Sequence, residues 1–85
     1  MVHRDIELNS SSWLKAQSAA EFINKSSEFK SSVWVEKDNR KANAKSLLGL
    51  LALGITPGCS VRLIAQGEDE ETAVTALGEF MIQNV

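Results

Sequence analysis

Apolar and polar residues alternate in several short stretches of the chain, which is the pattern of strands that bury one face. Near the start, Val2, Ile6 and Leu8 share a face, although Arg4 interrupts it. Further along, Val33 and Val35 share a face in a stretch rich in residues that favour strands. The pattern predicts strands over 2–8, 32–37, 40–44 and 60–66.

Two other stretches have the spacing of amphipathic helices. In the first, residues at i, i+3, i+4 and i+7 stand beside Phe22; they are Ala16, Ala19, Ala20 and Ile23. We expect this helix to end near Ser26. The second helix starts at about Asp69, and its apolar stripe consists of Val74, Leu77 and Met81. Gly78 lies inside it and costs about 1 kcal/mol relative to alanine.

The order of the predicted elements is β-α-β-β-α-β-α, in one domain over 1–85. Asp38 and Asn39 separate the second and third strands, and both residue types tolerate the positive φ of a tight hairpin turn. Each helix has one apolar stripe and each strand one apolar face. The chain therefore predicts an α+β fold of two layers, with helices on one face of a sheet.

The segment NAKSLLGLLALG, residues 43–54, predicts a third helix that does not have a single apolar stripe, because its leucines lie on all sides of the helix. Ser46 is a good N-cap for this helix and Gly54 a good C-terminal stop. A helix in a two-layer domain needs apolar residues on about one face. Either the surplus face is covered, or it faces water and offers an anchor to a partner.

Ser46 has two interpretations. As a plain cap, its oxygen accepts a hydrogen bond from an unpaired amide of the first helical turn. As a modification site, it would carry a phosphate of about −1.5 to −2 charges beside the leucines, where a partner's arginine could pair with it. The residue types alone leave both interpretations open.

Composition excludes several classes of function. The chain has 85 residues and a net charge of −2, which gives no basic surface for direct binding of nucleic acid. No stretch approaches the roughly 20 apolar residues of a membrane span. The start, MVHRDIELN, lacks the apolar core of a signal peptide. The only cysteine, Cys59, cannot form an internal disulfide and suits the cytoplasm.

The sequence has few of the residues that form catalytic or metal centres. His3 is the only histidine and stands far from Cys59 in sequence, so neither a zinc site nor a Cys/His pair is indicated. We expect His3 on the surface of a strand. The acidic run 68–71 fits the positive end of the last helix. We predict no enzyme activity, no metal and no cofactor.

The segment ANAKSLLGLLALG, residues 42–54, resembles the VNAKSIMGLMSLG-like segments of the HPr family, the histidine-containing phosphocarriers of the bacterial sugar phosphotransferase system. The resemblance continues through EKDNRKANAKS and GCSVRLIAQGEDEETAVTAL and needs no gap. The run LIAQGEDE is most similar to the Crh-type members of that family. The resemblance implies an open-faced β-sandwich, with a four-stranded antiparallel sheet and three helices on one face.

The family's regulatory serine falls on Ser46. The resemblance implies that HPr kinase/phosphorylase phosphorylates it, and that the product is a corepressor of a LacI-type catabolite control repressor. The apolar residues that would dock both partners correspond to Leu47, Leu48 and Leu51, with Lys45 beside them. This resemblance favours the exposed-patch interpretation and the modification of Ser46.

The sequence departs from the family where HPr proteins carry GLHARP. Lys15 occupies the position of the phosphorylated histidine, Gln17 that of the arginine and Ser18 that of the proline. A lysine has a reference pKa of about 10.4 and is a cation without a free lone pair at neutral pH, so we expect histidine phosphotransfer to be lost. Gln17 cannot form the ionic fork of an arginine, which weakens or reorients repressor binding.

Lys15 is either a solvated charge or part of an anion-attracting corner near Ser46. The leading hypothesis is a regulatory Crh-like protein of the cytoplasm in a low-GC Gram-positive bacterium. One alternative is a phosphocarrier that uses another acceptor, and a second is a degenerate paralogue. The resemblance also suggests a homodimer in which two chains exchange their first strands, with the polar segment 9–12 as the hinge.

Overall fold

The computed structural model describes residues 1–7, 16–54 and 60–83. These residues form the predicted order of elements. The strands are β1 (Val2–Glu7), β2 (Ser32–Lys37), β3 (Arg40–Asn43) and β4 (Ser60–Gln66). The helices are α1 (Ala16–Ser26), α2 (Leu47–Ala52) and α3 (Glu70–Gln83). Leu8, the predicted end of the first strand, and the polar segment 9–12 lie outside the described residues.

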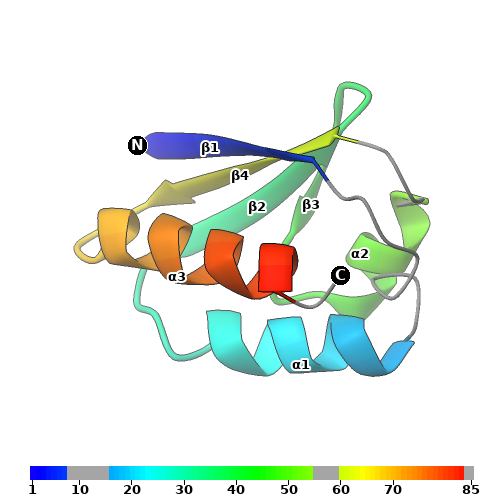
Figure 1. Ribbon diagram of the computed structural model, residues 1–85, viewed down its shortest axis with the longest axis horizontal. Coiled ribbons are helices and arrows are strands. Elements are labelled where there is room, and N and C mark those ends of the chain that lie inside the picture. Colours follow the sequence, from blue (N-terminus) through cyan, green and yellow to red (C-terminus); the bar gives the residue numbers. More distant parts are fainter. Residues whose placement is uncertain (8–15, 55–59, 84–85) are drawn as a thin grey trace.

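The strands form one antiparallel sheet in the order β1-β4-β2-β3. In Figure 1, α1 and α3 run side by side on one face of this sheet. Helix α3 packs against β1 and β4, whereas α2 packs against β3 and α1. The α+β fold with a four-stranded antiparallel sheet and three helices on one face is therefore confirmed.

The hairpin between β2 and β3 forms as predicted. Asp38 and Asn39 have φ values of 52° and 65°, so both adopt the left-handed conformation of a tight turn. Strand β3 ends at Asn43, one residue before the predicted end at Ala44. Ala44 is fully buried, and its N–H still donates to the carbonyl of Val33 at 2.9 Å.

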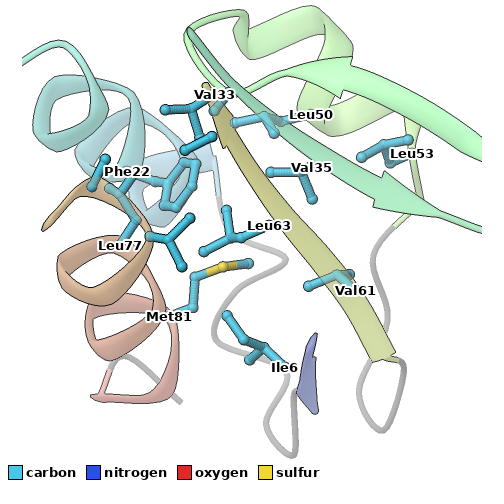
Figure 2. Close-up of a cluster of buried hydrophobic side chains, with 14 residues drawn as sticks. Ile6, Phe22, Val33, Val35, Leu50, Leu53, Val61, Leu63, Leu77 and Met81 are labelled. Carbon is cyan, nitrogen blue, oxygen red and sulfur yellow. The ribbon is translucent and has the colours of Figure 1, made fainter. Parts of the chain in front are cut away.

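The core lies between the sheet and the helices, as Figure 2 shows. The inward faces of the strands meet side chains from all three helices. Leu77 and Met81 of the predicted α3 stripe are fully buried, as is Phe22 of α1. The labelled residues of this core are Ile6, Phe22, Val33, Val35, Leu50, Leu53, Val61, Leu63, Leu77 and Met81.

The buried face of α1 differs from the predicted stripe at Ala20, whereas Ile23 packs against the core as predicted. Ala20 is exposed and Ile23 only half-buried, whereas Phe22 and Ser26 are fully buried. A phenyl ring removes far more apolar area from water than an alanine methyl group, so the helix turns Phe22 inward. Ser26 ends the helix as predicted. Its hydroxyl lies 2.9 Å from the carbonyl oxygen of Ile23 and 3.3 Å from that of Ala44, and either can accept its hydrogen bond.

Candidate functional site

The turn before α2 presents Ser46 in the conformation of an N-cap. The carbonyl of Asn43 accepts the N–H of Ser46 at 3.0 Å, and its side-chain oxygen accepts the N–H of Lys45 at 2.8 Å. Ser46 is thereby held extended, with φ −114° and ψ 115°. Its Oγ accepts the N–H of Gly49 at 3.2 Å, so the cap predicted from the sequence is present.

The other end of α2 is also as predicted. Leu53 is the C-cap, and the next residue, Gly54, has a φ of 66°. Its N–H donates to the carbonyl of Leu51 at 3.2 Å. A residue with a side chain is strained in this conformation, so glycine ends the helix here.

The leucines of α2 divide into two sets. Leu50 and Leu53 enter the core, each with 3% exposure. Leu47, Leu48 and Leu51 have exposures of 38%, 82% and 47% and form one apolar surface, which we call the leucine patch. The prediction that the surplus face of this helix is directed to water is therefore confirmed for the described chain, and the half-buried Ser46 stands at the first residue before the patch.

Among the residues that the structure describes, Lys45 and Arg40 are basic side chains near α2, and both contact backbone carbonyls. The ammonium group of Lys45 lies 3.2 Å from the carbonyl of Phe29 and 3.5 Å from that of Ser31. The guanidinium of Arg40 donates to the carbonyl of Leu53 at 3.3 Å, at the C-terminal end of the helix. The Lys45 ammonium is thus held only by two neutral carbonyl oxygens near the surface, and an anion close by would bind it more strongly than they do.

The other predicted site residues belong to the start of α1. Gln17 lies in the first turn of this helix, and its side chain is outside the described part of the structure. Lys15 falls outside the described residues altogether. Helix α1 packs against α2, and in Figure 1 the amino-terminal end of α1 lies on the same side of the molecule as α2. The backbone thus brings Gln17 to the same end of the molecule as the leucine patch.

Sequence reasoning missed one role within the acidic run. Instead of serving only the dipole of α3, the carboxylate of Asp69 accepts the N–H groups of Lys30 and Ser31, both at 2.9 Å, and the hydroxyl of Ser31. These hydrogen bonds lower the pKa of Asp69 from 3.8 to about 2, with that from the Ser31 hydroxyl the largest cause. Asp69 thereby ties the α1–β2 connection to the start of α3.

Glu70 acts nearer to its predicted role. Its carboxylate accepts the N–H of Gly67 at 3.1 Å and lies 3.2 Å from the terminal ammonium of Met1. These contacts lower the pKa of Glu70. His3 lies on β1 and is exposed, as predicted.

Within residues 1–7, 16–54 and 60–83, no three histidine, cysteine, aspartate or glutamate side chains gather closely enough to hold a metal ion. Over the same residues, every helix is too short or too polar to cross a membrane.

A family model, curated proteins and solved structures each match this chain along nearly its whole length. The family model described as PTS HPr component phosphorylation site matches residues 2–83. The HPr-like protein Crh of Bacillus subtilis (strain 168) is 41% identical over 85 residues, which is 100% of both chains. The crystal structure of HPr-C-His from Thermoanaerobacter tengcongensis has a TM-score of 0.84 and 42% identity, and the match covers 98% of this chain and 97% of that one.

A crystal structure of Bacillus subtilis Crh, described as a swapped and intertwined dimer, has a TM-score of 0.80 and 41% identity. That match covers 100% of this chain and 98% of the other.

Proposed function

The chain belongs to the HPr family, and from this premise we propose that it is a Crh-like regulatory protein, switched by phosphorylation of Ser46, and not a carrier of phosphate to sugars. HPr kinase/phosphorylase would attach the phosphate, and a LacI-type catabolite control repressor would bind the modified protein. The setting would be the bacterial cytoplasm.

The observation that carries this proposal is the position of Ser46 beside the leucine patch. Leu48 is 82% exposed, in a domain too small to leave apolar area unused. Burying one leucine is worth roughly 1.5–3 kcal/mol, so the patch can anchor a partner. A serine next to such an anchor is well placed to control which partner binds.

A phosphate on Ser46 would change the charge of this surface without entering the core. It would add about −1.5 to −2 charges and three acceptor oxygens. Ser46 is only half-buried and lies outside the core cluster, so the leucines of the core need not move. The ammonium of the adjacent Lys45 could leave its carbonyl contacts and pair with the phosphate, and a partner's arginine could bind the remaining oxygens.

Loss of histidine phosphotransfer completes the proposal. In the resemblance to HPr proteins, the position of the phosphate-accepting histidine falls on Lys15. A protonated amine lacks the lone pair that attacks phosphorus, whereas a neutral imidazole has one near pH 7. Gln17 would contribute an amide contact to the repressor in place of an ionic fork.

The kinase reaction tests the modification. Incubation with ATP and HPr kinase/phosphorylase should add one phosphate, located on Ser46 by mass spectrometry. Ser46→Ala should stay unmodified, whereas the matched control Ser32→Ala, an exposed serine of β2, should be modified at the normal rate. An unmodified wild-type chain would contradict the proposal and favour a degenerate paralogue.

A binding titration against the repressor tests the leucine patch. Phosphorylation should raise the affinity, and Leu48→Ser should lower it by about 10-fold or more, as expected when an anchoring leucine loses its burial. Ile82→Ser is the matched control, because Ile82 is 41% exposed but lies on α3, outside the leucine patch. Equal losses in both variants would show that the patch has no specific role.

The similarity to HPr of Thermoanaerobacter tengcongensis also favours a second candidate, a phosphocarrier with another acceptor. Incubation with phosphoenolpyruvate and enzyme I separates the two. We expect no label on the protein. Acid-labile label on Lys15 or His3 would establish the carrier and overturn the regulatory proposal.

A homodimer formed by exchange of β1 is proposed from the swapped dimer described for Crh of Bacillus subtilis. Size-exclusion chromatography with light scattering should reveal a dimer that exchanges slowly with the monomer. A single species with the mass of one chain at every concentration would contradict it.

A further inference from the structure

The face of the sheet opposite the helices is built differently from the inward face. The side chains of Ile6, Val35 and Leu63 point into the core, and successive residues of a strand point to opposite faces. Their neighbours along the strands therefore lie on the other face. Among the described residues all three helices pack on the inward side, so this outer face has no covering layer.

One complete row of charges crosses the outer face. In the register of the sheet, Asp5 of β1 lies opposite Arg62 of β4, and Arg62 lies opposite Glu36 of β2. Glu36 in turn lies opposite Lys41 of β3. The charges thus alternate as minus, plus, minus, plus across the strand order β1-β4-β2-β3.

The row keeps its charges accessible. The Nε of Arg62 lies 2.8 Å from a carboxylate oxygen of Asp5, and the two side chains remain 46% and 64% exposed. This pairing lowers the pKa of Asp5. An open depression of about 320 Å³ borders the row; Asp5, Glu36 and Arg62 line it together with the turn between β2 and β3 and the start of β4. The depression leaves room for side chains of a facing molecule.

A second row, two residues along the strands, is apolar at its centre. Its register places Ile64 of β4 between His3 and Trp34, and Trp34 beside Asn43. Trp34 is half-buried, and the ammonium of Lys41 lies 5.5 Å from its ring centroid. Ile64 is only 7% exposed, so the half-buried indole of Trp34 is the apolar group of this pair that a facing molecule can reach.

We propose that this outer face binds the same face of a second copy of the chain. A two-fold axis that lies between the two sheets and runs along the strands reverses the lateral order of the partner's strands. It places β3 of one copy over β1 of the other, and β2 over β4. The partner's Lys41 then faces Asp5, and the partner's Glu36 faces Arg62. Every charge in the row meets its opposite, and each contact occurs twice.

The same rotation matches the second row. It places the partner's Trp34 over Ile64 and the partner's Ile64 over Trp34, so apolar groups meet apolar groups. Two sheets packed face to face stand about 10 Å apart, which long side chains such as arginine, lysine and tryptophan can span. The face therefore complements itself in both charge and polarity, which is the property of an isologous interface.

The size of the face sets the strength of the contact. Four strands about 4.8 Å apart, each about 20 Å long at roughly 3.3 Å per residue, give a face of roughly 300–400 Å², which is smaller than the roughly 800 Å² per partner of a stable interface. The dimer should therefore be weak and should dissociate as salt screens the charged row. This contact is independent of Ser46 and the leucine patch, and also of the exchange of β1.

Charge reversal tests the interface. The test starts from the monomer fraction of size-exclusion chromatography, from which any dimer formed by slow exchange of β1 has been removed. By analytical ultracentrifugation of this fraction at low salt, the sedimentation coefficient of the wild-type chain should rise with concentration and return to the monomer value near 1 M NaCl, roughly where screening is complete. Glu36→Lys and Arg62→Glu should each weaken the dimer by about 10-fold or more, because each places like charges face to face twice. An equimolar mixture of the two variants should dimerise again, since Lys at 36 of one then faces Glu at 62 of the other.

Recovery in the mixture can arise only between molecules, so it separates the interface from changes within one chain. Lys30→Glu is the matched control: Lys30 is exposed in its pair with Glu68, off the strands, and its reversal should leave the dimer unchanged. Thermal melts check that each variant folds. A wild-type chain that stays monomeric at low salt, a dimer that survives both reversals, or a mixture that stays monomeric would each overturn the proposal.

Discussion

Replacing Ser46 by alanine removes the oxygen that accepts the N–H of Gly49 and leaves that amide without its cap. Loss of a serine cap costs about 1 kcal/mol, within a range of roughly 0.5–2. Helix α2 has only 6 residues, so the cap is a large part of its local hydrogen bonding. The cost is bounded because Leu50 and Leu53, each 3% exposed, still hold the helix in the core.

The free energy of unfolding should therefore fall by about 1 kcal/mol in Ser46→Ala, measured by urea titration. The midpoint of thermal unfolding should fall by roughly 4–8 °C, the usual shift for a domain of this size. Ser46→Asp is the informative companion, because aspartate caps helices as well as serine does. It should keep the stability of the wild type.

If Ser46→Ala matches the wild type in urea, the cap carries no energy and the geometric reasoning is wrong. If Ser46→Asp is as unstable as the alanine variant, an anion at this position disturbs the fold. That result would contradict the argument that a phosphate changes the surface while the core stays intact.

Three further outcomes follow from other contacts. Leu50→Ala should cost about 2–5 kcal/mol, whereas Leu48→Ala should change stability by less than about 0.5 kcal/mol, since only Leu50 is buried; urea titration of both variants checks this. Hydrogen bonds lower the pKa of Asp69 from 3.8 to about 2, so the unfolded chain binds more protons than the folded chain between these pH values. The free energy of unfolding should therefore fall as the pH drops through this window, and Asp69→Asn should flatten that part of its pH profile. Gly78→Ala should stabilise the protein more in an Arg4→Ala background than alone, because a Cβ at 78 meets the Arg4 guanidinium at 2.7 Å; a double-mutant cycle measures the difference.

Much of the fold could be predicted from local pattern. Period-two alternation located the strands, and the Asp38-Asn39 pair located the hairpin, because these signals depend only on neighbouring residues. The end caps of α2 were equally local, since a cap is a contact within one helical turn. The α1 stripe was wrong at Ala20, because spacing alone gave alanines the same weight as Phe22, whose burial decides the orientation of the helix.

The candidate site was less predictable, because its key properties depend on distant parts of the chain. Leucines surround α2, so periodicity could not tell that Leu50 enters the core while Leu48 faces water. Contact of the helix with β3 and α1 decides that. Likewise, the carboxylate of Asp69 binds amides 38 and 39 positions away, and no pattern within the acidic run indicates their place.

Arg4 and Gly78 show how two exceptions to a pattern can explain each other. Arg4 interrupts the apolar face of β1, and Gly78 weakens the helical propensity of α3. In the structure the guanidinium of Arg4 occupies the space that Gly78 leaves open. It lies 3.5 Å from a carboxylate oxygen of Glu79 and 3.4 Å from the carbonyl of Thr75. A side chain at 78 would push the guanidinium of Arg4 away from both groups. A glycine in α3 is therefore what allows Arg4 of β1 to make these two contacts.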